Sequence, residues 1–568
     1  MYAKQQAITE VMKALKKHIG KGFTITPDMI DAPPDRTFGD FAFPCFELAK
    51  GEGRNPAEIA TELAAKIGPT KLIDRAQSRG PYVNFFLNDK EVTERVLKEV
   101  LKSKTPYGNS NLGEDRRVLL EYAQPNTHKE FHVGHIRNAV LGQSVMNILR
   151  ANGFEVIGAS YIGDIGAHVA KALWGLNRFH KGEEFEEEER AMKLGDVYTE
   201  ATVYADLHEE AKEEIAEVQR KLEAGDPDLL AQWKETREWS LKAFRRIFEE
   251  LHVTPDVWYY ESDVEGPGKE LVKKLLTDGI AKKSEGATVV DLEQEELGAF
   301  LILKSDGSSL YATKDLALAL LKDKTYAPDR QIVVVDVRQE LYFKQLFATL
   351  RRMGFTQKLV HLSYDMVNLP EGTMSSRTGN IITYDALRGA MQDVLREETR
   401  TRHADWDEKK VEKTAHAIAG AAITFMMLRQ DPHSIITFDM QEAMSVEGFT
   451  GPYILYTIAR IESVRNKTKR KPIVNAALLT QKGERELVRA LAEFPSVVQH
   501  AGQTFQVSAI AQWAFDTSKI FSEYYHAVQI VVPEDNEGTS ARLALALAVQ
   551  KALIRALELL AIEPVMEM

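Results

Sequence analysis

Between residues 118 and 364 the sequence alternates short apolar stretches with longer ones of helical spacing, and this alternation leaves few folds open. Gly134 to Ala151 has apolar residues at helical spacing and stops at Asn152-Gly153. A second such helix is expected from Glu340 to Met353. The stretches that read as strands are 118–123, 154–160, one near Val289, 332–335 and 358–364. Strands that alternate with helices predict a parallel sheet with crossover connections.

With 568 residues the chain is too long for one ordinary domain. We expect a small N-terminal α/β module at 1–108 and an alternating core at 109–395. The core includes a charged helical insertion at about 165–255. Residues 396–568 have an almost purely helical pattern, and Ala541 to Leu560 is expected to form an amphipathic helix. The chain is therefore predicted to be a multidomain protein that combines α/β and all-α domains.

Composition favours a protein of a reducing cytoplasm that does not enter a membrane. The hydrophobic share is 44% and the charged share is 27%, as in globular proteins that dissolve in water. No apolar run reaches the roughly 18 residues that a membrane span needs, and the N-terminus lacks the apolar segment of a secretory signal. Cys45 is the single cysteine, so we expect no internal disulfide and no Cys-rich zinc site.

The charge of the chain is unevenly distributed. Its formal net charge of −12 argues against a general nucleic-acid binder, which is usually basic. Acidic residues gather at 183–189, whereas basic residues gather at 467–471 and around Arg351. Such a run is more often a solvated face than a binding site. A local surface that binds phosphates is still compatible with the acidic total.

The segment His132-Val133-Gly134-His135 follows an expected strand and a Pro-Asn turn, and a helix is expected to begin there. Ligands of a doubly wound sheet bind at the carboxyl ends of its strands, and a helix N-terminus attracts phosphate. Imidazole N–H groups can donate to phosphate oxygens, and Gly134 leaves room for a flat base against the backbone. The four residues alone are also compatible with a polar turn that carries two surface histidines.

A second polar, glycine-containing segment lies about 240 residues later, after another expected strand. It reads Thr373-Met374-Ser375-Ser376-Arg377-Thr378-Gly379-Asn380. Each segment is a weak signal by itself. Together they predict a split site for the triphosphate of ATP.

These two segments resemble the signature motifs of class I aminoacyl-tRNA synthetases. The first resembles their HIGH element, and the pattern Pro-Asn-x-x-Lys-x-x-His-x-Gly-His resembles its arginyl-tRNA synthetase version. The second resembles the KMSKS loop, although Thr373 and Ser376 stand where lysines usually occur. That departure weakens the case for a lysine-based pyrophosphate clamp, but arginyl-tRNA synthetases often lack the second lysine. The resemblance implies a Rossmann-like, doubly wound parallel sheet as the catalytic core.

The resemblance assigns phosphate chemistry to both segments. His132 and His135 are expected to donate to the phosphates of ATP. Lys129 and Arg377 are expected to supply the positive charge that the departing pyrophosphate needs. The residues expected to bind ATP are His132, Gly134, His135, Met374, Ser375 and Ser376. The simpler interpretation of Lys129 is a solvated lysine.

A cationic side chain would suit a set of carboxylates further along the chain. Tyr311 and Asp315 are four residues apart, so they share a face if this stretch is helical. Carboxylates can grip the five planar donors of a guanidinium in pairs. Composition cannot select the right carboxylates among 84 acidic residues. The resemblance implies an arginine site formed by Asn126, Glu261, Tyr311, Asp315 and Gln339, although Asp315 also fits an acid that stabilises a helix N-terminus.

The resemblance extends to both flanks, where it implies contacts with tRNA. Tyr82 and Asn84 match an N-terminal domain that contacts the tRNA elbow, where stacking and an amide suit an unpaired base. The stretch 448–460 resembles one near the inner corner of the bound tRNA. The final helical domain resembles the anticodon-binding domain, where aromatic residues can stack on bases. The residues expected to bind tRNA are Tyr82, Asn84, Tyr453, Tyr456, Arg460, Tyr524 and Tyr525. For Tyr82 and Asn84 the simpler interpretation is an ordinary half-buried strand, and for Tyr524 and Tyr525 it is a pair of core aromatic residues.

The implied activity is the ATP-dependent attachment of L-arginine to tRNA(Arg) through an arginyl-adenylate. The implied partners are tRNA(Arg), L-arginine and ATP, with Mg²⁺ bound to the ATP, no zinc and no membrane. We expect a monomer because the family is usually monomeric.

Three alternatives are weighed against this interpretation. A small-molecule nucleotidyltransferase shares the His-x-Gly-His element but needs neither flanking domain. Another class I synthetase is disfavoured, because a cysteinyl enzyme needs a set of thiolates for zinc and the insertion is short for an editing domain. An RNA-binding, catalytically dead relative is supported by the missing loop lysines and opposed by the intact histidine pair and acidic residues.

Overall fold

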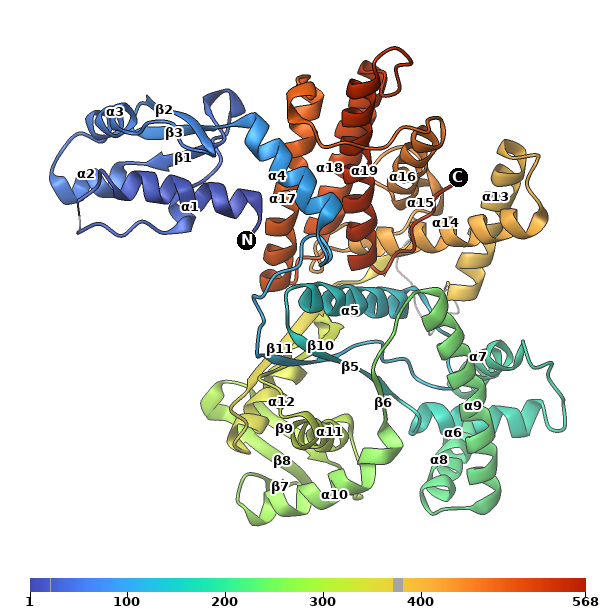
Figure 1. Cartoon of the computed structure of the whole chain (residues 1–568). Coiled ribbons are helices and arrows are strands. Elements are labelled where there is room, and N and C mark those ends of the chain that lie inside the picture. The colour runs from blue at the N-terminus through green and yellow to red at the C-terminus, as the bar shows by residue number, and fades with distance from the viewer. Residues whose placement is uncertain (21, 371–381) are drawn as a thin grey trace.

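The computed structural model describes residues 1–20, 22–370 and 382–568, and a five-stranded parallel sheet lies at its centre (Figure 1). The strands lie in the order β11-β10-β4-β5-β6, and all neighbouring pairs are parallel. Their bounds are β4 (Arg117–Glu121), β5 (Glu155–Ile162), β6 (Val257–Tyr260), β10 (Arg330–Asp336) and β11 (Lys358–Tyr364). The chain starts in the middle of the sheet, moves to one edge and then crosses to the other. This is the predicted doubly wound sheet, and its switch point lies between β4 and β10.

Helices connect these strands, as the alternating pattern predicted. One helix, α5, links β4 to β5, and it separates the sheet from the C-terminal helices (Figure 1). Four helices form the insertion between β5 and β6. The bounds are α5 (Val133–Ala151), α6 (Ala167–Phe179), α7 (Arg190–Leu207), α8 (Glu209–Glu223), α9 (Pro227–Glu250), α10 (Glu261–Thr277), α11 (Tyr311–Tyr326), η4 (Val337–Gln339) and α12 (Glu340–Arg352).

The expected strand near Val289 does not join the central sheet. It is β8, the middle strand of a separate antiparallel sheet with the order β7-β8-β9. Buried residues of this small sheet pack with those of α10, α11 and α12 in one apolar cluster. The bounds are β7 (Lys282–Ser284), β8 (Ala287–Leu292), η3 (Glu293–Glu295) and β9 (Gly298–Leu303). A strand pattern predicts the extended backbone, but the partner strand is chosen by packing over long distances.

The N-terminal part has its own antiparallel sheet, with the order β1-β3-β2, and its own apolar core. In Figure 1 it extends to one side of the molecule. Its last helix, α4, packs against the C-terminal helices instead. The bounds are α1 (Ala3–Lys16), η1 (Pro27–Met29), η2 (Arg36–Phe38), β1 (Phe41–Pro44), α2 (Phe46–Glu52), α3 (Pro56–Lys66), β2 (Ile73–Arg79), β3 (Tyr82–Leu87) and α4 (Asp89–Lys102).

Helices dominate the rest of the chain, and they share one apolar core with α5. The Ser144 hydroxyl of α5 donates to the Leu559 carbonyl at 2.8 Å. The last long helix is not amphipathic as predicted, because it is buried on nearly every side. The bounds are β12 (Val367–Asn368), α13 (Tyr384–Arg402), α14 (Glu408–Leu428), β13 (Ile436–Thr437), α15 (Met440–Met444), α16 (Gly451–Asn466), η5 (Ala476–Leu478), α17 (Lys482–Thr504), α18 (Ser508–Ala527) and α19 (Asn536–Leu559).

Candidate active site

The two signature histidines lie at the N-terminus of α5, where the sequence predicted that a helix begins. Nδ1 of His132 accepts a hydrogen bond from the backbone N–H of Gly134 at 3.1 Å. Nδ1 of His135 accepts one from the backbone N–H of His132 at 3.3 Å. The two rings stack with their centroids 3.9 Å apart. The pair therefore caps the first turn of the helix.

Burial keeps both imidazoles neutral. It lowers the pKa of His132 to about 4, and the charge of Lys129 acts in the same direction. It lowers the pKa of His135 well below its usual value, with smaller contributions from His132 and Lys129. Because each Nδ1 accepts a hydrogen bond, the proton of each neutral ring is on Nε2. Each ring can therefore donate one Nε2–H to an anion at this helix N-terminus.

A cavity of about 370 Å³ lies beside the histidine pair, at the carboxyl ends of β4, β10 and β11. We call it the histidine cavity. Gly134 lines it, and a Cβ atom there would lie 3.0 Å from Cε1 of His132, so a larger residue would push the ring. The four loop residues expected at this site lie outside the described residues. They are Met374, Ser375, Ser376 and Arg377.

A second cavity, of about 360 Å³, lies next to the first, and we call it the acidic cavity. All five residues of the expected arginine site line it. They are Asn126, Glu261, Tyr311, Asp315 and Gln339. Asn126 and Gln339 also line the histidine cavity. The structure therefore brings the acidic residues and the histidine pair into two adjoining cavities.

Two helix N-termini position the carboxylates of the acidic cavity. Glu261 is the first residue of α10, directly after β6, and Tyr311 and Asp315 share the first turns of α11. The hydroxyl of Tyr342 donates to Oδ2 of Asp315. Burial raises the pKa of Glu261 to about 7 and that of Asp315 to about 6, even though Lys314 opposes the rise in both.

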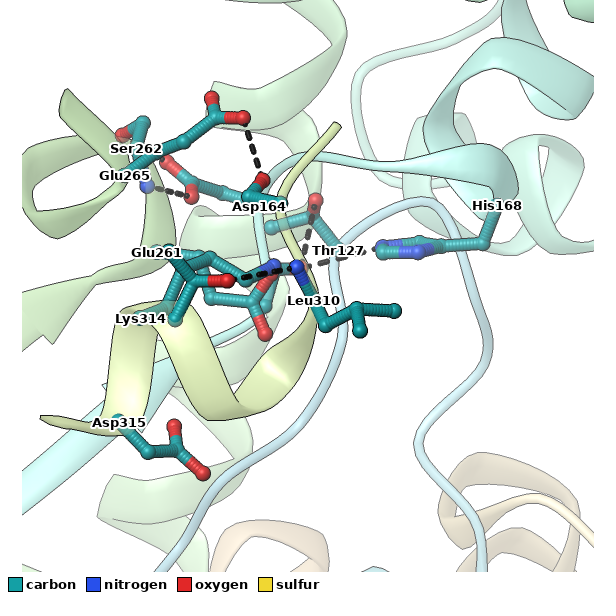
Figure 2. A network of polar contacts seen from close by, with 12 residues as sticks. Thr127, Asp164, His168, Glu261, Ser262, Glu265, Leu310, Lys314 and Asp315 are labelled. Atoms are coloured by element: carbon teal, nitrogen blue, oxygen red, sulfur yellow. Dashed lines mark hydrogen bonds and ion pairs between the residues drawn. The ribbon is translucent and has the colours of Figure 1, made fainter. Parts of the chain in front are cut away.

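Two buried lysines, which the sequence did not single out, neutralise carboxylates of this region. Nζ of Lys314 pairs with Oε2 of Glu261 (Figure 2). Nζ of Lys322 pairs with Oε2 of Glu121, and both of these residues line the acidic cavity. Burial lowers the pKa of Lys322 to about 7. These partners are far apart in the sequence, so no local pattern could reveal them.

Asp164 fixes the backbone beside Glu261, and it is not among the site residues expected from the sequence. Its Oδ1 accepts the backbone N–H of Ser262 at 2.9 Å, and its Oδ2 accepts the Ser262 hydroxyl at 2.7 Å (Figure 2). Arg237 of α9 donates to the same Oδ2 at 2.8 Å. The position of Asp164, just after β5 at the edge where ligands bind, is the signal that could have found it.

Asn126 reaches both cavities because Gly163 has no side chain. A Cβ atom on Gly163 would lie 2.0 Å from Oδ1 of Asn126, which is far inside contact distance. The neighbouring Thr127 also donates its backbone N–H to the Gly163 carbonyl at 2.9 Å. The close approach of these two segments sets the place of the Asn126 amide.

Lys129 does not line the histidine cavity. Its Nζ lies 4.9 Å from the centroid of the Tyr198 ring on α7, and it lines a separate cavity with Phe131 and Ser240. Its charge is still close enough to lower the pKa of both histidines. The structure thus places Lys129 beside the site, held by the insertion, rather than in it.

The two N-terminal residues expected to bind tRNA are on the same face of β3. Tyr82 is 40% exposed and packs edge-on against Phe46, which is also exposed. Asn84 is two residues later and is only 4% exposed. The exposed aromatic pair offers a face on which a base could stack.

The expected tRNA contacts of the C-terminal part divide into two groups. Arg460 lies over the rings of Tyr456 and Tyr525, at 4.5 and 5.0 Å, and these three side chains are half-buried. Tyr453 is also half-buried and packs near Phe515. Tyr524, however, is 2% exposed, and its hydroxyl donates to Glu484 inside the core. The prediction that Tyr524 stacks on a base is wrong, because helical spacing did not reveal which face of α18 is buried.

Within the described ranges, no helix is both long and apolar enough to cross a membrane. In the same ranges, no three His, Cys, Asp or Glu side chains are grouped in a way that could hold a metal ion.

Comparisons with known proteins match three segments of the chain to domains of one family. The family model for the catalytic domain of tRNA synthetases class I (R) matches residues 96–439. The arginyl tRNA synthetase N terminal domain matches 5–87, and the DALR anticodon binding domain matches 454–568.

Individual relatives are similar over nearly their full length. The arginine–tRNA ligase of Bdellovibrio bacteriovorus is 37% identical over 529 residues, which cover 91% of this chain and 90% of that protein. That of Halothermothrix orenii is 32% identical over 94% of both chains. The solved arginyl-tRNA synthetase of Thermus thermophilus superposes with a TM-score of 0.82 at 27% identity, covering 100% of this chain and 99% of the other. These matches show that the chain belongs to the arginyl-tRNA synthetases, within class I.

Proposed function

We propose that this chain attaches L-arginine to tRNA(Arg) with ATP as the energy source, forming AMP and pyrophosphate. The two adjoining cavities carry this proposal. A guanidinium between Glu261 and Asp315 in the acidic cavity would leave the α-amino and carboxylate groups of arginine near Asn126 and Gln339. These two residues also line the histidine cavity, where the α-phosphate of ATP would lie.

The first step needs placement and charge rather than a general base. An oxygen of the arginine carboxylate attacks the α-phosphorus, the bond to the bridging oxygen of the β-phosphate breaks, and pyrophosphate leaves with that electron pair. His132 and His135 donate their Nε2–H groups to phosphate oxygens. Mg²⁺ enters with ATP, held mainly by phosphate oxygens and water.

The positive charge for the departing pyrophosphate is assigned to Lys129 and Arg377. Met374, Ser375 and Ser376 are assigned to the phosphates together with Gly134. For Lys129 this assignment requires its side chain to leave the ring of Tyr198, 4.9 Å away, and turn toward the nucleotide.

In the second step, the 2′-hydroxyl of the terminal ribose attacks the carbonyl carbon of arginyl-adenylate. The bond between that carbon and the phosphate oxygen breaks, AMP leaves with the electron pair, and the hydroxyl proton passes to the phosphate or to water. The N-terminal module and the C-terminal helices hold the tRNA, with the exposed Tyr82 at its elbow and Asn84 buried beside it. Tyr453, Tyr456 and Arg460 lie near the inner corner of the tRNA, and Tyr525 stacks on an anticodon base. We assign the domain limits 1–108, 109–395 and 396–568 to these roles. We also assign the reaction to the cytoplasm and to a monomer.

One experiment separates this function from its alternatives. The full-length chain is incubated with ATP, total tRNA and each of the twenty amino acids in turn, and charged tRNA is measured. Arginine should dominate. Preferential charging of lysine would show that the pocket selects a positive charge but not the planar shape of the guanidinium. No charging at all would favour an RNA-binding protein without catalysis.

A further inference from the structure

Lys314 contacts a wall residue of the proposed substrate pocket from the side opposite to the acidic cavity. Its side chain is 8% exposed, and its Nζ pairs with Oε2 of Glu261 (Figure 2). Glu261 lines the acidic cavity, whereas Lys314 lines a different cavity together with Ile165 and Trp233. The ammonium therefore touches Glu261 on the side that faces away from the proposed substrate.

The two carboxylates of the pocket are held in the same way. One oxygen of Glu261 is engaged by Lys314, and one oxygen of Asp315 is engaged by the hydroxyl of Tyr342. In the described parts of the chain, no protein donor is bound to Oε1 of Glu261 or to Oδ1 of Asp315. Each carboxylate thus keeps one oxygen for a ligand, and the two free oxygens can meet two donors of one planar guanidinium.

We propose that Lys314 is a positioning residue, which keeps Glu261 charged and fixed so that the pocket selects a guanidinium side chain. This inference rests on the proposed arginine specificity. Lys314 does not touch the substrate. It acts mainly through Glu261, which it contacts, and adds a smaller effect of its charge on Asp315.

The surroundings of Glu261 explain why it needs a cation. Burial is the largest influence on its pKa and raises it, Lys314 opposes that rise, and Asp315 and Asp164 add to it. Without Lys314, the pKa of Glu261 would rise above its value of about 7, and the pocket would lose more of its negative charge at neutral pH. The charged and titratable groups that face Glu261 are Lys314, Asp315, Tyr311, Tyr342, Tyr161 and Asp164.

The experiment compares Lys314→Met, Lys314→Arg and, as a matched control on the same helix, Lys324→Met at an exposed position. Steady-state charging of tRNA(Arg) gives KM for arginine and kcat between pH 6 and 9, and calorimetry gives arginine affinity directly. Loss of one charge-assisted contact predicts a rise in KM of about ten- to hundredfold for Lys314→Met at pH 7. The deficit should shrink toward pH 9, where Glu261 ionises without help. Lys314→Arg should restore most of the affinity, and Lys324→Met should match the wild type.

A second comparison separates positioning from folding. If Lys314 acts mainly through Glu261, the double variant Glu261→Gln with Lys314→Met should bind arginine nearly as well as Glu261→Gln alone. This double variant removes both members of the buried ion pair, so neither is left as an unpaired charge, and it provides the test if Lys314→Met does not fold. Citrulline, a neutral analogue of arginine, should compete relatively better against arginine in Lys314→Met than in the wild type.

The outcomes distinguish this inference from the proposed function. A wild-type chain that charges no arginine would defeat the proposed function. A wild-type chain that charges arginine, with a Lys314→Met variant whose KM is unchanged or whose deficit is the same at every pH, would overturn the role of Lys314. Additive losses in the double variant would overturn it as well.

Discussion

The buried guanidinium of Arg137 ties the signature helix to the far wall of the histidine cavity. Arg137 lies in α5, two residues after His135, and is 1% exposed. Its Nη1 donates to the Asp365 carbonyl at 2.5 Å, and its Nη2 donates to the carbonyls of Pro432 and Ser434 at 3.0 and 2.9 Å. These carbonyls belong to the segments that lead into β12 and β13.

Replacing Arg137 with Met should loosen those segments by a measurable amount. Burial lowers the pKa of this guanidinium only to about 10, so it is charged at neutral pH. The substitution removes the charged donor from the Asp365 and Ser434 carbonyls. A hydrogen bond to a charged group contributes about 1.5–3 kcal/mol, so the loss of two costs at least about 3 kcal/mol. That value is a factor of roughly 150 in the equilibrium for local opening.

The hydrogen-exchange rates of two backbone amides measure this opening directly. The backbone N–H of Asp365 donates to the Pro432 carbonyl at 2.9 Å, and that of Ile436 donates to the Met366 carbonyl at 3.1 Å. Both amides should exchange about a hundredfold faster in Arg137→Met than in the wild type. Because Asp365 and Met366 line the histidine cavity, KM for ATP should rise as well.

The matched control is Arg150→Met, at the other end of the same helix. Arg150 is 40% exposed in its side chain and pairs with Asp256 at 2.7 Å, so its loss should cost less than about 1 kcal/mol. If the two variants speed exchange of the Asp365 and Ile436 amides equally, the structural role given to Arg137 is refuted.

Three further substitutions test the site and its flanks. Lys129→Met should lower kcat by about a hundredfold with little change in KM for ATP, and equal activity in stopped-flow and steady-state assays would dispose of its role. Gly163→Ala should displace Asn126 and raise KM for arginine by about tenfold, measured with thermal melts to confirm that the fold is intact. Tyr82→Ala should raise KM for tRNA(Arg) by about tenfold through lost stacking, while calorimetry shows unchanged arginine binding.

Local signals predicted the catalytic core well. The strand 358–364 was predicted with the bounds that β11 has, and α5 begins and ends within a residue of its prediction. Apolar periodicity and the Asn-Gly stop at 152–153 depend only on residues that are neighbours in the sequence, so they can be recognised without knowing which distant segments pack against them. The place of the histidine pair followed from the same signals, because a helix that follows a strand begins at the ligand-binding edge.

Contacts between distant segments could not be predicted in this way. Lys314 meets Glu261 across 53 residues, and Lys322 meets Glu121 across 201 residues. A single sequence holds no rule that pairs one of its 84 acidic residues with a particular lysine. The same limit explains the antiparallel sheet around Val289 and the buried face that holds Tyr524, since both depend on which distant element packs against them.

The helical insertion shows how contacts between distant segments position the residues of the candidate site. The sequence showed only a charged helical stretch, yet α9 contacts residues next to the walls of the two cavities at two points. Arg237 binds Asp164, which fixes the residue after Glu261. Thr236 and Ser240 bind the ring and the backbone N–H of His128, whose backbone has the left-handed φ of 61°. Because His128 directly precedes Lys129, the insertion contacts both a residue beside the wall of the acidic cavity and the loop that leads to the histidines, so a change in its packing must affect both cavities.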